Sequence, residues 1–281
     1  MRINILHIGL NVFFDSKSDI IYGLFNALRS LGHETTIGHN LVERSALNLI
    51  VGSDLICCER SVLQNLFETN VDYAVFEVEN FNGKTINYRK NFDLEGYRLL
   101  LEKSKFCLTP YQYNIRELKK LISGDLIFYT KWGYHDSMVN DQISRSSEFA
   151  HEALFYGLIK ADRDEKVKRL NEAFKNKVKV ITQEDPFTIR NYFISNSRFG
   201  LSLSYGEFDN FVNPFRLYHM VANGMPVLSD HTEDEDNYTH LCENSDFPTL
   251  VSNIDSFEPD LKAMKERCHS EKLASNLRPF F

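Results

Sequence analysis

The sequence contains few of the residues that are abundant in disordered or disulfide-linked proteins. Its 281 residues include 13 Gly, 7 Pro and 5 Cys. This composition excludes collagen-like and low-complexity disordered proteins. No C-x-x-C pair occurs, and the number of cysteines is odd. The cysteines therefore indicate small apolar side chains in a reducing compartment, and they do not indicate a disulfide framework or a structural zinc site.

Positive charge and long apolar runs are also scarce. The chain carries 32 Lys and Arg against 39 Asp and Glu, a formal net charge of −7. Non-specific nucleic-acid binding depends on cations that neutralise phosphates, so we expect no nucleic-acid partner. The opening RINILHIG is too short for a signal peptide or a membrane-spanning helix. We expect a cytoplasmic protein, and peripheral contact with a membrane surface stays open.

Short apolar runs alternate with amphipathic stretches along the first half of the chain. Residues 3–8 predict a buried strand, residues 15–19 a polar loop, residues 20–31 a helix that ends at Gly32, and residues 33–39 a second strand. Further short apolar runs predict strands at 47–51, 54–58, 71–78, 105–109 and 126–129. Amphipathic stretches between them predict helices at 94–103 and 113–122. This alternation is typical of a mostly parallel α/β sheet.

A polar, serine-rich stretch at residues 140–148 interrupts the pattern, which then begins again. The second half predicts strands at 153–159, 178–182, 199–204 and 225–229, and helices at 163–175, 188–195, 214–223 and 260–277. We therefore expect two Rossmann-like, doubly wound domains facing across a cleft, over residues 1–145 and 146–259. Residues 260–281 would pack back on the first domain. Small-molecule sites form preferentially in such clefts.

Several common site motifs are missing. The first strand is followed by HIGLN, whose single glycine does not make the G-x-G-x-x-G of dinucleotide-binding proteins. Walker, G-x-S-x-G and H-E-x-x-H motifs do not occur either. The D-x-D sequences at 162–164 and 234–236 lie in polar stretches and not at strand ends. A site that binds a nucleotide-sugar through a carboxylate-held metal is therefore not expected.

Residues 198–230 carry the most information about function. A strand ends in a glycine-containing loop, and a helix begins at Pro214, with Asn213 suited to cap it. The unpaired N–H groups and the dipole of such a helix start favour an anion. Arg216 lies in the first turn, where it could hold a phosphate bidentately or simply face solvent.

This helix segment resembles the nucleotide-sugar-binding half of GT-B glycosyltransferases. Their pattern R-x-Y-E-x-x-A-x-G, followed by x-P-V-x-x-D, corresponds to Arg216, Tyr218, His219, Ala222, Gly224, Pro226, Val227 and Asp230. A second feature of these families corresponds to Phe155, Tyr156, Gly157, Ile159, Arg163 and Leu170. The L-G-H sequence at 31–33 looks like the opening of their acceptor-side domain. His219 stands where these families usually have a glutamate that holds the ribose.

The resemblance implies roles for these residues. Gly157 would let the backbone approach the diphosphate, and Arg163 and Arg216 would neutralise the leaving nucleotide in place of a divalent metal. No metal and no cofactor other than the co-substrate is then expected. The donor site implied in full comprises Gly157, Arg163, Tyr205, Gly206, Glu207, Asn213, Pro214, Phe215, Arg216 and His219.

Candidate catalytic bases lie in the first half. Glu77 and Glu79 share one face of a predicted strand at its carboxyl end, where either could take a proton from an acceptor hydroxyl. Asp15 is a further candidate, whereas Ser18 or Asp19 could instead cap the helix over 20–31. An inverting mechanism would use such a base, a retaining one would not, and both stay open.

Taken with the resemblance, these features predict a metal-independent glycosyltransferase that acts in glycan biosynthesis. It would move a sugar from a nucleotide-sugar donor to a glycan, a lipid-linked acceptor or a protein. Two alternatives stay open: a nucleotide-sugar epimerase of the same fold, and a non-catalytic module that binds a nucleotide or a glycan.

Overall fold

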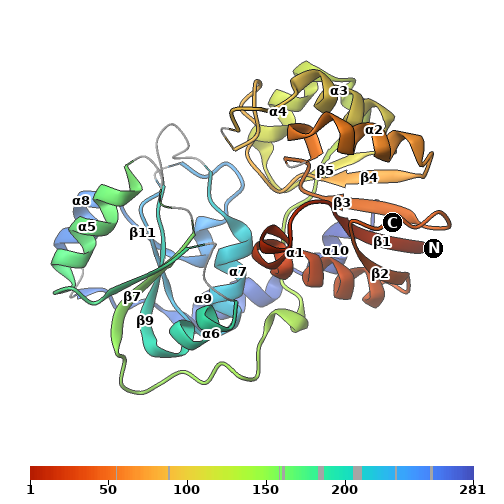
Figure 1. Ribbon diagram of the computed structural model, residues 1–281. Coiled ribbons are helices and arrows are strands. Elements are labelled where there is room, and N and C mark those ends of the chain that lie inside the picture. Colours follow the sequence, from red (N-terminus) through yellow and green to blue (C-terminus); the bar gives the residue numbers. More distant parts are fainter. Residues whose placement is uncertain are drawn as a thin grey trace. The chain divides into compact units, whose positions relative to one another are not determined.

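The computed structural model describes residues 1–54, 56–87, 89–157, 159, 162–182, 187–204, 211–231, 233–253 and 256–281, without the side chains of 11–16 and 187–188. The chain forms two structural units (Figure 1). Residues 1–132 and 273–281 make the first unit, and residues 133–272 make the second.

The first unit is built on a parallel sheet. Among the described residues the sheet has six strands, in the order β2-β1-β3-β4-β5-β6. Their bounds are β1 (Arg2–His7), β2 (Glu34–His39), β3 (Leu47–Val51), β4 (Tyr73–Phe76), β5 (Cys107–Thr109) and β6 (Ile127–Tyr129).

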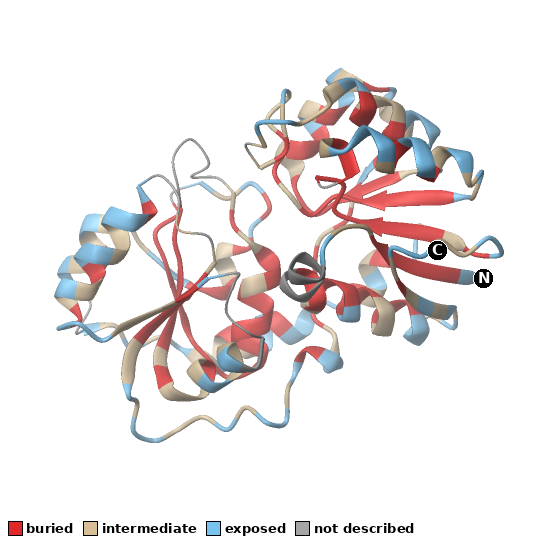
Figure 2. Ribbon diagram, in the orientation of Figure 1, coloured by how far each residue is buried: buried red, intermediate tan, exposed pale blue. Residues whose placement is uncertain are grey.

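Helices cover both faces of this sheet. On one face lie α2 (Arg60–Glu68), α3 (Leu94–Lys103) and α4 (Gln112–Leu121), and on the other α1 (Asn11–Ser30) and α10 (Leu273–Leu277) (Figure 1). Two 3-10 turns complete the described elements of the unit, η1 (Ile56–Cys58) and η2 (Gly124–Leu126). The central strands are buried along their length, as expected of a parallel sheet with helices on both faces (Figure 2).

Two predictions in the first unit are wrong. Helix α1 begins at Asn11, and Leu10 is its N-cap residue, so residues 15–19 are helical and neither Ser18 nor Asp19 caps it. Among the described side chains of 15–19, those of Lys17 and Ser18 are buried, whereas a sequence pattern counts both as exposed. The run over 54–58 is not a strand, because it contains the buried turn η1.

The second unit contains another parallel sheet, with five strands among the described residues in the order β11-β10-β9-β7-β8. The strands are β7 (His151–Tyr156), β8 (Val178–Ile181), β9 (Ser197–Ser202), β10 (Val227–Ser229) and β11 (Glu243–Asn244). One face carries α5 (Arg163–Ala173) and α8 (Phe247–Ser252) (Figure 1). The other face carries α6 (Phe187–Asn196), α7 (Pro214–Ala222) and α9 (Leu261–Ser270). The described 3-10 turns of this unit are η3 (Asp136–Met138) and η4 (Thr239–Leu241).

The two units divide the chain differently from the predicted domains. The second unit begins at Gly133 and not at residue 146, because the polar linker is bonded to its helices. Asn223, the C-cap residue of α7, donates to the carbonyl of Met138 (2.9 Å) and accepts from the Asn140 amide (2.8 Å). The predicted helix over 260–277 is two helices. Only α10 belongs to the first unit, whereas α9 packs against α7 in the second.

Both sheets have a doubly wound strand order, which confirms the predicted α/β architecture of two Rossmann-like units. In each, the second strand along the chain lies outside the first, so the order reverses between β1 and β3 and between β7 and β9. Ligands of such folds bind beyond the carboxyl ends of the strands at this reversal. No helix in the described part of the chain is both long and apolar enough to cross a membrane.

Candidate functional sites at the two strand reversals

At the reversal in the second unit, Gly157 and Arg216 lie against each other. Gly157 follows β7 with a φ of +145°, and its amide donates to the carbonyl of Ile181 (2.9 Å). A Cβ at this position would overlap Nη2 of Arg216. The guanidinium therefore rests directly on the glycine backbone, and a side chain at 157 would displace it.

Arg216 is held by aromatic rings and by the start of a helix. Its Cζ lies 5.2 Å from the ring centroid of Phe155 and 5.3 Å from that of Tyr156. All of α7 is described, and Arg216 is its only residue that is not buried. The side chain of Asn213 accepts from the Arg216 amide (3.0 Å), which confirms the predicted cap, with Pro214 in the first turn. A partly exposed cation, a glycine backbone and a helix N-terminus thus meet, an arrangement suited to a phosphate.

Arg163 reaches the same aromatic ring but has a backbone partner. Its Nε and Nη2 donate to the carbonyl of Leu203, at 2.9 and 2.6 Å, and its Cζ lies 5.6 Å from the ring centroid of Phe155. The residue is buried at the start of α5. The geometry shows that Arg163 anchors the chain just beyond β9, and its contact with a phosphate stays a prediction.

A second anchor at this edge, Lys166, was not predicted from the sequence. Its Nζ lies 2.8 Å from Oδ2 of Asp230 and donates to Oγ of Ser204 (2.6 Å). The other carboxylate oxygen of Asp230 accepts from the Ser204 amide (2.6 Å). Lys166 follows Arg163 by three residues, so both lie on one side of α5, and this spacing was the available signal.

The remaining predicted donor residues differ in what the structure shows of them. Tyr205, Gly206 and Glu207 lie outside the described residues. Phe215 is buried in the first turn of α7. His219 is buried further along α7, where its carbonyl accepts from the side chain of Asn223 (2.8 Å). A ribose contact for His219 stays a prediction.

A charged cluster occupies the reversal in the first unit. Lys17 of α1 and Asp54, which follows β3, are both buried, and Nζ of Lys17 lies 2.8 Å from Oδ1 of Asp54. Arg89 binds the other oxygen of Asp54 at 2.7 Å, and Glu79 lies 3.9 Å from Lys17. Gly52, at a φ of +70°, makes room for this arrangement, because a Cβ there would overlap Nζ of Lys17.

The cluster shifts the pKa values of its members. Burial alone would favour a neutral Asp54, but Lys17 and Arg89 outweigh it and lower the pKa of Asp54 to about 2. Burial likewise opposes the charge of Lys17, but the nearby carboxylates raise its pKa above the ordinary value. Burial lowers the pKa of His7 to about 4, helped by Lys17 and His39. His7 is therefore neutral at pH 7, and it is buried.

The strand predicted over 71–78 ends at Phe76, so Glu77 and Glu79 lie in the loop after β4 and not on one face of a strand. They have different environments. Glu77 is fully buried, and it accepts hydrogen bonds from Oγ of Ser53, the hydroxyl of Tyr97 (3.3 Å) and the amide of Glu79 (3.1 Å). The side chain of Glu79 is 27% exposed. Burial raises the pKa of both, and that of Glu79 reaches about 7 although Lys17 opposes the shift. Glu79 is thus the carboxylate that a substrate could reach. Asp15 lies in α1, and its side chain is outside the described part.

Within the described residues, no group of three or more His, Cys, Asp or Glu is placed to hold a metal ion. Glu207 and Asp209 lie outside the described residues. Metal independence therefore stays a prediction.

No protein-family model and no curated protein matches the sequence. Solved structures do match the fold. An alpha-glucosyltransferase, solved in complex with UDP and a 13-mer DNA containing a HMU base, is 11% identical with a TM-score of 0.56, over 99% of this chain and 94% of that one. The lipopolysaccharide outer core galactosyltransferase WaaB is 9% identical with a TM-score of 0.50, over 99% and 98%.

A third match is the UDP-GlcNAc 2-epimerase from Methanocaldococcus jannaschii. It is 12% identical with a TM-score of 0.50, over 91% of this chain and 92% of that one. At such low identities the matches establish the fold. With its two parallel, doubly wound sheets and these structural neighbours, the chain has the GT-B fold.

Proposed function

We propose that this chain is a glycosyltransferase whose second unit binds the diphosphate of a nucleotide-sugar donor. The observation that carries the proposal is the arrangement of Arg216, packed between the Gly157 backbone and the rings of Phe155 and Tyr156 at the start of α7. Such stacking fixes a guanidinium in position while leaving its N–H groups in a geometry that suits a phosphate.

In this proposal Arg216 and the N–H groups of α7 stabilise the nucleotide as it leaves. Negative charge develops on the diphosphate when the bond to the sugar breaks, and each well-placed donor lowers the barrier by about 3–4 kcal/mol. This stabilisation replaces that of a divalent metal. Arg163 and Lys166 contribute by fixing the chain just beyond β9.

Glu79 is the proposed general base of an inverting reaction. The acceptor hydroxyl oxygen forms a bond to the anomeric carbon, the bond from that carbon to the diphosphate breaks, and the nucleotide leaves with the electron pair. The hydroxyl proton passes to the carboxylate of Glu79, whose pKa of about 7 matches the needs of a base at neutral pH. The acceptor is a glycan, a lipid-linked molecule or a protein.

UDP is the first nucleotide to test, because two of the neighbouring structures, the alpha-glucosyltransferase and Alr3699/HepE of Anabaena, were solved in complex with it. The experiment measures UDP release from UDP-glucose, UDP-galactose and UDP-GlcNAc in EDTA, with and without a mixture of acceptors. We expect release by the wild type and none by Arg216→Ala. Arg198→Ala is the matched control, because Arg198 also lies in the second unit over a phenylalanine ring, that of Phe199.

An epimerase is the second candidate, favoured by a neighbour of the same fold. It would convert a UDP-sugar into its epimer with no acceptor and no net UDP release, so chromatography of the same reactions separates the two candidates. UDP binding with neither product would leave the non-catalytic binding module.

A further inference from the structure

We propose that a cavity in the first unit binds the hydrocarbon chain of an amphiphilic acceptor, an inference that rests on the proposed glycosyl transfer. The cavity has a volume of about 600 Å³ and lies beyond the carboxyl ends of β1 and β2, beside α2. This volume is within the range of about 300–1,000 Å³ that is usual for small-molecule sites.

The apolar side chains of the cavity are aliphatic. Ile8, Leu10 and Val42 line it from the loops after the strands, and Val62 and Leu66 line it from α2. No aromatic ring is among its described lining residues. Polar side chains also line the cavity, among them Asn40, Glu59 and Arg89, and sugar hydroxyls can bond to these. Hydroxyls held against the aliphatic side chains lose water without gaining a hydrogen-bond partner, which is costly. An alkyl chain gains free energy in the same place with every methylene buried.

Exposed leucines flank the cavity. Leu10 lines it although 67% of the residue is exposed, and Leu41, which is 71% exposed, stands between the lining residues Asn40 and Val42. Single exposed leucines are common, but here one lines the cavity and the other lies between two lining residues in the chain. A ligand that covers them as well as filling the cavity must be apolar over that length.

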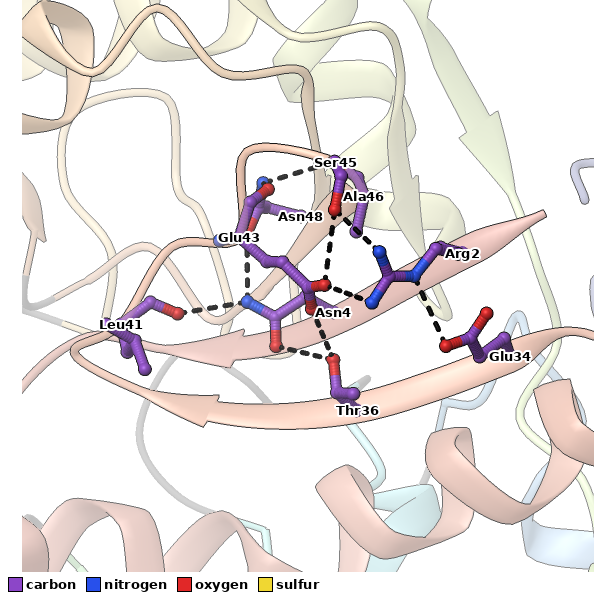
Figure 3. A network of polar contacts seen from close by, with 9 residues as sticks. All are labelled: Arg2, Asn4, Glu34, Thr36, Leu41, Glu43, Ser45, Ala46 and Asn48. Atoms are coloured by element: carbon purple, nitrogen blue, oxygen red, sulfur yellow. Dashed lines mark hydrogen bonds and ion pairs between the residues drawn. The ribbon is translucent and has the colours of Figure 1, made fainter.

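The loop that carries Leu41 is fixed in place by a polar network (Figure 3). The buried side chain of Asn4 donates to the carbonyl of Leu41 (3.0 Å) and to Oδ1 of Asn48 (2.9 Å). The same Oδ1 accepts from the Glu43 amide (2.9 Å), and the carboxylate of Glu43 lies 2.7 Å from Arg2. The wall is therefore preformed, which lowers the entropy lost when a ligand binds.

The cavity shares Arg89 with the charged cluster that contains the candidate base. Arg89 lines it and binds Asp54 at 2.7 Å, and Asp54 in turn binds Lys17, which lies 3.9 Å from Glu79. An amphiphile with its chain among the aliphatic residues would place its hydroxyl-bearing head group next to this charged cluster.

The test measures calorimetric binding of methyl, hexyl and octyl β-glucoside to the full chain, below the concentrations at which they form micelles. We expect no measurable binding of the methyl glucoside and roughly tenfold tighter binding of the octyl than of the hexyl glucoside. Val62→Asn and Leu41→Ser should each weaken octyl glucoside binding at least about fivefold. Val139→Ser, which alters an exposed apolar residue of the second unit, should leave it unchanged.

Equal affinities across the series, no binding of the octyl glucoside, or unchanged octyl binding by both variants would overturn the proposal. UDP binding is measured on the same samples. Octyl binding without UDP binding would support the cavity and contradict the donor site, whereas UDP binding without octyl binding would do the reverse.

Discussion

Glu77 and Glu79 lie two residues apart and look equivalent in the sequence, yet only Glu79 is partly exposed. Glu77 is enclosed by hydrogen bonds from Ser53 and Tyr97, which come from distant parts of the chain. Both residues follow the end of β4 at Phe76, so the period of a strand does not determine which of their side chains is covered. The sequence therefore identifies both carboxylates as candidate bases, but it does not predict which of them is accessible to a substrate.

At this scale the first prediction concerns Glu79→Gln. Loss of a general base should lower the rate of transfer about 10²–10⁴-fold and leave UDP affinity unchanged. Because the base acts when deprotonated, the wild-type rate should rise with pH through about 7, and the variant should lose that rise. Glu34→Gln, on an exposed carboxylate of the same unit, is the control. A variant with wild-type rate and pH profile would rule out Glu79 as the base.

Gly52 supports the second prediction. Gly52→Ala combines a strained φ of +70° with an overlap on Lys17, which is buried and ion-paired. Gly32→Ala has a similar φ of +89° with open space around it. We expect Gly32→Ala to cost about 1 kcal/mol and Gly52→Ala about 1–2 kcal/mol more, measured by urea unfolding. Equal costs would show that the packing of Lys17 against Gly52 contributes nothing.

At the scale of elements, the strands and helices that were predicted well are those whose apolar residues face the core at a regular spacing. Helix α3 was predicted at its observed bounds, Leu94–Lys103. The start of α1 was missed because Lys17 is buried through its bond to Asp54, a contact that no local pattern contains. The short apolar run over 54–58 shows the other failure, since periodicity cannot separate so short a strand from a buried turn.

A third prediction separates anchoring from binding at the edge of the second sheet. Arg163→Met removes two hydrogen bonds from a charged group to the Leu203 carbonyl and should lower the free energy of unfolding of the second unit by about 2–3 kcal/mol. Arg216→Met, on a half-exposed side chain, should change it by less than about 0.5 kcal/mol. The measurement is urea unfolding of both variants. Equal destabilisation by the two would contradict the anchoring role of Arg163.

At the scale of the whole molecule, alternating strands and helices were enough to predict two doubly wound units. Their boundary was not predicted, because a polar linker looks like a domain border whether or not its backbone is bonded to the following unit. The hydrogen bonds of Asn223 to the segment over 138–140 connect this linker to the second unit. The division between α9 and α10 was missed for a similar reason, since both continue one amphipathic pattern.

The fourth prediction tests how the end of the chain contributes to the first unit. Leu273 and Leu277 of α10 are buried there, and the rings of Phe280 and Phe128 lie 5.5 Å apart. Truncation after Lys272 should destabilise the first unit by at least about 3 kcal/mol through the two leucines alone. Hydrogen exchange should then accelerate in β1 to β6 and stay unchanged in β7 to β10. Unchanged exchange in the first unit would contradict the assignment of α10 to it.

The measurement that tests the central claim most directly is the thermal stability of the wild type and of Arg216→Ala with UDP in the presence of EDTA. A nucleotide that binds only the folded protein raises its melting temperature. We predict an increase of several degrees for the wild type and none for Arg216→Ala, whose melting temperature without UDP should equal that of the wild type. No increase for the wild type, or an equal increase for the variant, would contradict a nucleotide site built on Arg216.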